Sequence, residues 1–150
     1  MATLFLDSSA IIKQYVAEIG STWIRNIVQL ATGNTIVLSA IATVEVCSAL
    51  ARLRRMNQIT PADELQSRGD FLFDVKSRYI MIGLDDALLN RAAFLPSQHQ
   101  LRALDSIQLS CAIGSIITLH TTATFLSADN NLLLAASKEG FAIDNPLNHP

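Results

Sequence analysis

Short apolar runs alternate with helical patterns along almost the whole chain, and this alternation restricts the possible folds more than any other feature. The runs have the length of buried β-strands. They cover residues 3–6, 35–38, 79–82, 123–126 and 141–143. Continuously apolar strands are typical of a mainly parallel sheet whose two faces are covered by helices. The sequence therefore predicts an α/β fold, a three-layer α/β/α sandwich with four or five central strands.

Turn-forming and capping residues mark the limits of several predicted helices. We expect one helix to start near Ala10, after polar residues suited to capping it, and another to open at Thr60-Pro61. Asp85-Asp86 opens a further helix, which Pro96 is expected to close. The remaining predicted helices cover residues 20–31, 41–56, the segment around Asp105, and residues 130–138.

Size and composition fit one domain over residues 1–150. The chain is 50% hydrophobic, and no linker or internal repeat suggests a second domain. Polar residues such as Ser110 and Gly114 interrupt the longest apolar stretch, so we expect no membrane span. The first residues lack a basic segment followed by an apolar signal core, which favours a cytoplasmic protein. Cys47 and Cys111 are then expected to be buried thiols, not a disulfide.

Four of the thirteen acidic residues stand in strongly apolar stretches, where an unpaired negative charge is costly. Asp7 and Asp129 follow strands, whereas Glu45 and Asp105 lie within helical patterns. Ligands of open α/β sheets bind beyond the carboxyl ends of the strands, where the strand order reverses. We therefore expect the four side chains to converge there. Carboxylate oxygens without a nearby Cys/His cluster favour Mg²⁺ or Mn²⁺ over zinc.

The other nine acids have simpler interpretations. They fall in the first turns of helices, on polar helix faces beside basic residues, or in turns. We expect solvated surface positions and no chemical role for Glu18, Asp63, Glu64, Asp70, Asp74, Asp85, Asp86, Glu139 and Asp144.

The overall charge does not indicate a nonspecific nucleic-acid-binding protein. The formal net charge is −2, whereas such proteins have a basic footprint. A small nuclease can instead bind phosphates through metal ions and one local basic patch. Arg52, with Arg54 and Arg55, is the candidate patch. The same arginines would also complement the dipole at the end of their helix, so both interpretations stay open.

Four segments in order resemble the PIN domain family, and specifically the VapC-like ribonuclease toxins of bacterial toxin–antitoxin pairs. The segments are Leu6-Asp7-Ser8-Ser9-Ala10, Val44-Glu45-Val46 with Ser48-Ala49-Leu50-Ala51-Arg52, Leu101-Arg102-Ala103-Leu104-Asp105-Ser106-Ile107-Gln108-Leu109, and Phe125-Leu126-Ser127-Ala128-Asp129 with Leu132-Leu133. Each segment alone is a weak signal. Their order, their spacing and the α/β pattern between them make the combination specific over nearly the whole chain.

The resemblance implies a set of site residues and partners. Asp7, Glu45, Asp105 and Asp129 would be the acidic tetrad, and Ser9 would supply a hydroxyl that supports Asp7. The substrate would be RNA. A small antitoxin protein would cover the acidic cleft, and the toxin would form a homodimer.

The acidic residues and the resemblance together imply metal-dependent hydrolysis of an RNA phosphodiester bond. We expect Asp7, Asp105 and Asp129 to bind Mg²⁺ or Mn²⁺ directly, while Glu45 binds directly or through water. Whether one or two ions bind is left open. Asn130-Asn131 stand where relatives often have a charged or longer polar residue, a difference that could alter substrate contacts.

Two other functions are compatible with the sequence. A non-catalytic PIN-like binding or scaffold protein would use the carboxylates to hold a structural cation, and would show metal-dependent stability without RNA cleavage. A haloacid-dehalogenase-like phosphatase also has an Asp after its first strand. Such enzymes have Asp-x-Asp there, however, whereas Asp7-Ser8-Ser9 lacks the second acid. A small phosphomonoester tested beside an RNA oligonucleotide would separate these classes.

Overall fold

The computed structural model describes all residues from 1 to 150. The strands are β1 (Thr3–Leu6), β2 (Thr35–Ser39), β3 (Ile80–Ile82), β4 (Thr124–Leu126) and β5 (Ala142–Asp144). The α-helices are α1 (Ser8–Ile11), α2 (Ser21–Val28), α3 (Ala42–Arg55), α4 (Pro61–Ser77), α5 (Asp86–Gln98), α6 (Ala103–Leu119) and α7 (Asn130–Lys138). Three short 3-10 helices are η1 (Ile12–Gln14), η2 (Leu30–Thr32) and η3 (Pro146–Asn148).

The five strands form one parallel sheet in the order β3-β2-β1-β4-β5. The chain therefore builds outwards from β1 on one side and then crosses to β4 on the other. The strand order reverses between β1 and β4, whose last residues Leu6 and Leu126 are paired in register. This is the position at which an open α/β sheet offers a binding site.

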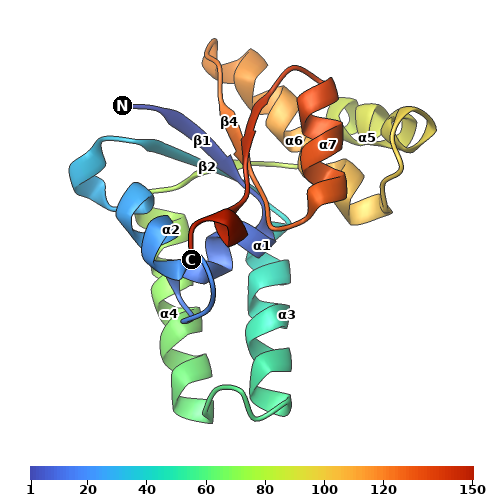
Figure 1. Ribbon diagram of the computed structural model, residues 1–150. Coiled ribbons are helices and arrows are strands. Elements are labelled where there is room, and N and C mark those ends of the chain that lie inside the picture. The colour runs from blue at the N-terminus through green and yellow to red at the C-terminus, as the bar shows by residue number, and fades with distance from the viewer.

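Helices cover both faces of the sheet, as the alternation predicted. Leu4, Leu6 and Leu38 point into a core shared with α1 to α4. Phe5 and Phe125 point to the opposite face and stack on each other in a core shared with α5, α6 and α7. Figure 1 shows α5 to α7 on one side of the sheet, and α3 and α4 side by side extending away from it. The three-layer α/β/α fold is confirmed.

Capping side chains explain where several helices begin. Asp7, Asp85 and Asp129 each stand before the first residue of a helix and accept hydrogen bonds from its backbone N–H groups. Thr60 and Asp63 form a reciprocal capping box at the start of α4, where Pro61 occupies the first helical position. No helix is long and apolar enough to cross a membrane.

Two predicted helix limits were wrong. Pro96 does not close its helix, since α5 continues to Gln98. A proline in the last turn removes only one hydrogen bond, and the N–H of His99 still donates to the Leu95 carbonyl. The first helix begins at Ser8, not near Ala10, because Asp7 is its cap.

Two acids expected to be solvated are instead largely buried. Glu64 is 8% exposed and forms ion pairs with Arg54 and Arg68, because α4 packs along α3. Asp74 accepts hydrogen bonds from the Tyr15 hydroxyl and, at 2.9 Å, from Arg78. Packing of α4 on α3 buries Glu64, whereas Tyr15 and Arg78 cover Asp74, and the pattern along one helix shows neither contact.

Candidate metal centre

Asp7 lies at the carboxyl end of the central strand and is 6% exposed. Its Oδ1 accepts hydrogen bonds from the Ser9 hydroxyl at 2.7 Å and the Ala10 N–H at 3.0 Å. Its Oδ2 accepts one from the Ser127 hydroxyl at 2.7 Å. The side chain is thus fixed from both β1 and β4, and three donors stabilise its charged form.

The loop after β4 brings Asp129 to the same edge of the sheet. The N–H of Asp129 donates to Ser127 Oγ at 3.0 Å, and the N–H of Ala128 donates to Ser9 Oγ at 2.9 Å. The pairing of β1 with β4 therefore continues beyond both strands through two serine hydroxyls. Asp129 itself is half-buried, and its Oδ1 caps α7.

Glu45 reaches this edge from the first turn of α3. Its Oε1 accepts hydrogen bonds from Ser8 Oγ at 2.9 Å and from Gln108 Nε2 at 2.8 Å. Gln108 also donates to Ser8 at 3.1 Å, so the three side chains form a closed triangle between α1, α3 and α6. Gln108 lies one turn after Asp105, on the same helix.

Electrostatic repulsion links all four acids. Burial, partly offset by the Ser9, Ser127 and Ala10 hydrogen bonds, raises the pKa of Asp7 to about 6, and repulsion from Glu45 adds to this rise. Burial also raises the pKa of Asp105, with further contributions from Asp129 and Glu45, against the attraction of Arg102.

The structure thus places each acid of the predicted tetrad in one neighbourhood. No three of their side chains approach closely enough to ligate one ion, and none of the four forms a salt bridge. Acidic side chains that form no salt bridge and offer only oxygen donors fit Mg²⁺ or Mn²⁺ chemically. Gln108 Oε1 is buried and has no hydrogen-bond partner.

A cavity of about 660 Å³ opens beside the acids. Its lining includes Ser8, Ser9, Lys13, Glu18, Glu45 and Arg52. Arg52 is the member of the predicted basic patch that lines it, whereas Arg54 pairs with Glu64. None of the four acids lines the four other main cavities.

Sequence reasoning missed the polar residues that hold the acids. Ser8, Gln108 and Ser127 each contact one of the four carboxylates, and Lys13 lines the adjacent cavity. A signal existed for two of them. Gln108 is a polar residue three positions after Asp105 in an apolar helix, and Ser127 stands between a buried strand and Asp129.

The chain matches the PIN domain family over residues 4–138. It therefore belongs to the PIN domain family, as its sequence motifs predicted. No curated protein shows significant sequence similarity to the chain.

Solved structures of toxin–antitoxin proteins share the fold. VapC20 of Mycobacterium tuberculosis, described as a sarcin–ricin loop cleaving toxin, has a TM-score of 0.63 at 11% identity, covering 92% of this chain and 95% of its own. VapBC2 of Rickettsia felis, bound to a promoter DNA fragment, has a TM-score of 0.59 at 17% identity, with coverages of 95% and 98%. A toxin–antitoxin complex from Klebsiella pneumoniae has a TM-score of 0.59 at 10% identity, with coverages of 95% and 97%.

Proposed function

We propose that this protein is a Mg²⁺- or Mn²⁺-dependent endoribonuclease and the toxin of a VapBC-type toxin–antitoxin pair. One observation carries the proposal: four carboxylates that form no salt bridge are electrostatically coupled near the sheet edge where the strand order reverses, in a chain of the PIN family. The likeness to VapC20, described as a toxin that cleaves the sarcin–ricin loop, supports RNA as the substrate class.

Each acid has a distinct role in this proposal. Asp7, Asp105 and Asp129 would hold the metal directly once their side chains move closer together than the structure places them, and Glu45 would bind it directly or through water. When bound, the divalent ion lowers the pKa of a water nucleophile and offsets the charge that develops on the phosphate. Ser9 and Ser127 hold Asp7 in its charged, correctly oriented form through their hydroxyl donors.

Arg52 would bind the RNA backbone beside the acids, since it lines the same cavity as Glu45. A small antitoxin would inhibit the enzyme by covering this cavity, and the toxin would form a homodimer. The similarity to a toxin–antitoxin complex supports the antitoxin partner. Sedimentation of the purified chain with and without a co-expressed antitoxin tests both assemblies.

Cleavage of defined RNA tests the catalytic proposal. Structured and single-stranded RNAs are incubated with Mg²⁺, with Mn²⁺ or with EDTA, using the native protein and its Asp7→Asn and Asp129→Asn variants. We expect cleavage only with metal and its loss in both variants. Asp85→Asn is the matched control, because Asp85 also caps a helix but contacts none of the four acids.

Undiminished cleavage by purified Asp7→Asn would contradict the mechanism. Metal-dependent stability with no cleavage of any RNA would favour the scaffold protein with a structural cation. Hydrolysis of a small phosphomonoester in place of RNA would favour the phosphatase.

A further inference from the structure

Lys13 is a buried cation beside the acidic centre, and the mechanism above does not use it. It lies in η1 and is 4% exposed. Its Nζ donates to Glu18 Oε1 at 2.7 Å. An ammonium group has three donors, and Glu18 is the only acceptor that the structure gives it. Two donors therefore have no protein partner, although the side chain lines the cavity that Glu45 also lines.

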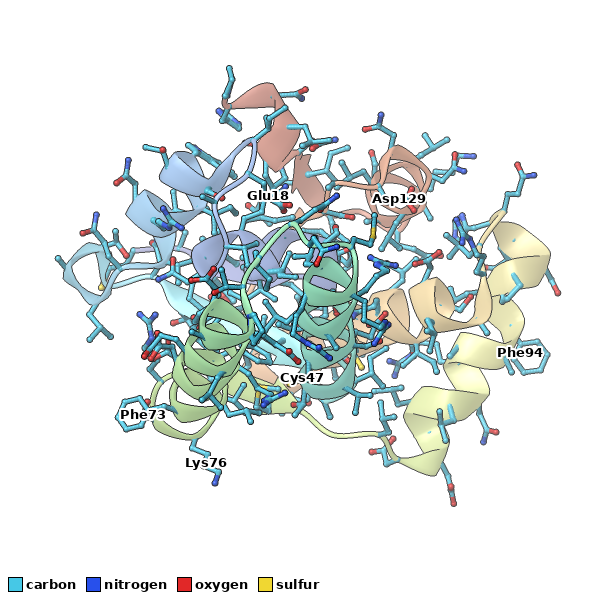
Figure 2. All side chains as sticks on the ribbon, turned by 90° about the horizontal axis from the view of Figure 1, so that it is seen from below. Glu18, Cys47, Phe73, Lys76, Phe94 and Asp129 are labelled. Carbon is cyan, nitrogen blue, oxygen red and sulfur yellow. The ribbon has the colours of Figure 1, made fainter.

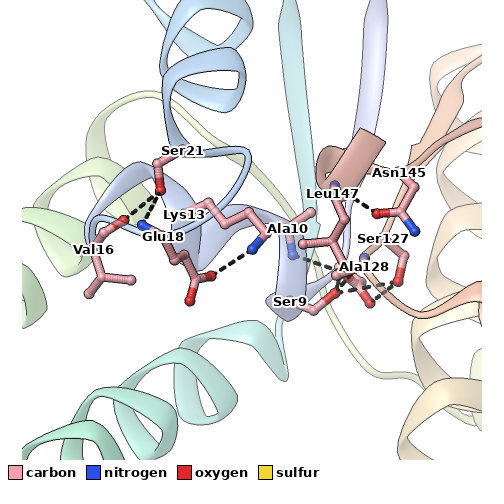
Figure 3. A network of polar contacts seen from close by, with 11 residues as sticks. Ser9, Ala10, Lys13, Val16, Glu18, Ser21, Ser127, Ala128, Asn145 and Leu147 are labelled. Carbon is pink, nitrogen blue, oxygen red and sulfur yellow. Dashed lines mark hydrogen bonds and ion pairs between the residues drawn. The ribbon is translucent and has the colours of Figure 1, made fainter. Parts of the chain in front are cut away.

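Glu18 covers the Lys13 ammonium but is not needed to shape the turn. The turn is held by Ser21, whose hydroxyl donates to the Val16 carbonyl at 2.7 Å and accepts from the Glu18 N–H at 3.0 Å. Figure 3 shows the two hydrogen bonds of Ser21 beside the separate Lys13–Glu18 contact. The Glu18 side chain is 39% exposed, so its carboxylate can swing into solvent without breaking the backbone contacts.

The lining of this cavity also includes a second cation, Arg52. Arg52 lies seven residues after Glu45 in α3, which is about two helical turns, so both are on one helix face. Lys13 lies four residues after Ser9 and lines the same cavity. Two cations thus line the cavity that Glu45 also lines, and cations in such a position can bind an extended phosphate backbone.

We propose that Lys13 binds a phosphate of the RNA backbone next to the acidic centre, and that Glu18 occupies this anion position in the free protein. This inference rests on the proposed ribonuclease function. The incoming phosphate displaces the Glu18 carboxylate, which then moves into solvent. Glu18 therefore weakens RNA binding, while Lys13 strengthens it.

RNA binding by charge variants tests this pair. Affinity for a fluorescent single-stranded RNA is measured in EDTA, which prevents metal-dependent cleavage, at about 50 to 200 mM salt. Lys13→Met should weaken binding about tenfold, the loss expected for one charge-assisted hydrogen bond. It should also reduce the slope of log affinity against log salt by about 0.7, the value for one phosphate contact. Glu18→Gln should tighten binding.

Lys76→Met is the matched control, because Lys76 is exposed on α4, and Figure 2 shows it far from Glu18 and Asp129. Thermal unfolding checks that each variant folds. A purely structural ion pair predicts that Lys13→Met and Glu18→Gln both lose stability and that neither changes the salt slope. That result would overturn the proposal, as would absence of RNA binding by the native protein in EDTA.

Metal-dependent cleavage by the native protein, measured separately, distinguishes the two proposals. An unchanged salt slope in Lys13→Met, with native cleavage intact, overturns only the phosphate site. Absence of native cleavage overturns the ribonuclease function, even where Lys13 contributes to RNA binding.

Discussion

Asp7 combines structural contacts with an environment that disfavours its charge. It caps α1 and joins β1 to β4 through the Ser127 hydroxyl, yet it is almost fully buried beside another acid. Burial favours the protonated form, and its pKa therefore rises from 3.8 to about 6. The native state consequently binds this proton more tightly than the unfolded chain does.

The raised pKa of Asp7 predicts a pH-dependent stability in the absence of metal. The stabilisation is fully present below pH 3.8 and is lost as pH rises through about 6. A shift of this size corresponds to about 3 kcal/mol of unfolding free energy. Asp7→Asn cannot ionise, and Asn keeps an oxygen for the Ala10 cap. In EDTA, the unfolding free energy of Asp7→Asn should therefore increase relative to that of the native protein as pH rises from 4 to 7.

Denaturant unfolding across that pH range measures the effect, and Asp85→Asn serves as its control because Asp85 is an exposed helix cap. A constant difference between Asp7→Asn and the native protein at every pH would contradict the raised pKa.

Under the proposed mechanism Gln108 would be a positioning residue that acts through Glu45. Its Nε2 and the Ser8 hydroxyl both donate to Glu45 Oε1. Gln108→Met keeps the side-chain length but removes the donor. Loss of such a supporting hydrogen bond typically reduces metal affinity or activity about 10- to 100-fold.

Cleavage kinetics at several Mg²⁺ concentrations distinguish this role from a structural one. We expect Gln108→Met to require more Mg²⁺ for half-maximal rate, while its KM for RNA at saturating Mg²⁺ stays near the native value. Gln98→Met, at an exposed position on α5, is the control. If Gln108→Met lowers the melting temperature but leaves the Mg²⁺ requirement unchanged, Gln108 has only a structural role.

At the scale of elements, the start of α2 depends on close contact with the end of the chain. Gly20 has a φ of 87°, and a Cβ there would collide with the Pro146 carbonyl in η3. Gly20→Ala should therefore cost more than about 1 kcal/mol, from backbone strain and the displaced η3. Gly69 offers the opposite case, because nothing lies within 4 Å of its Cβ position in α4.

Gly69→Ala should stabilise the protein by about 0.5–1 kcal/mol, since alanine is the better helix former. Denaturant unfolding of the two variants gives changes of opposite sign if the contacts are as described. Equal changes at both positions would mean that η3 does not pack on Gly20 in solution.

The sequence allowed the elements to be predicted better than their contacts. Continuous apolar runs identified the strands, because a parallel sheet buries both faces and needs no alternation. Caps such as Thr60 and Asp85 located helix starts, since they act on the nearest backbone N–H groups. Glu64 and Asp74 were misassigned because their burial depends on partners such as Arg54 and Tyr15 from other segments, and the pattern along one helix does not contain that information.

The same distinction applies to the candidate site. Asp7 and Asp129 could be placed at one sheet edge because both directly follow parallel strands. Gln108 and Lys13 could not, because their partners lie 63 residues away at Glu45 and across a turn at Glu18. A hydrogen bond between distant elements follows only from the three-dimensional packing.

Acidic and basic side chains are grouped at different places on the molecule, although its net charge is small. The net charge is only −2, yet four acids that form no salt bridge lie near one edge while two cations line the cavity beside them. The sheet that carries this edge lies between two hydrophobic cores, and each core contains residues of β1. The acidic edge therefore lies on a strand that belongs to both cores.

Metal binding should consequently stabilise the entire fold. An ion that binds only the native state adds about 2.7 kcal/mol at a concentration of 100 times its Kd, which raises the melting temperature of a domain of this size by roughly 5 to 10 °C. We expect Mg²⁺ or Mn²⁺ to raise the melting temperature of the native protein by this amount and that of Asp7→Asn by less. Asp85→Asn should respond like the native protein, and K⁺ at equal ionic strength should not reproduce the rise. Equal shifts in Asp7→Asn and the native protein would place the ion elsewhere on the molecule.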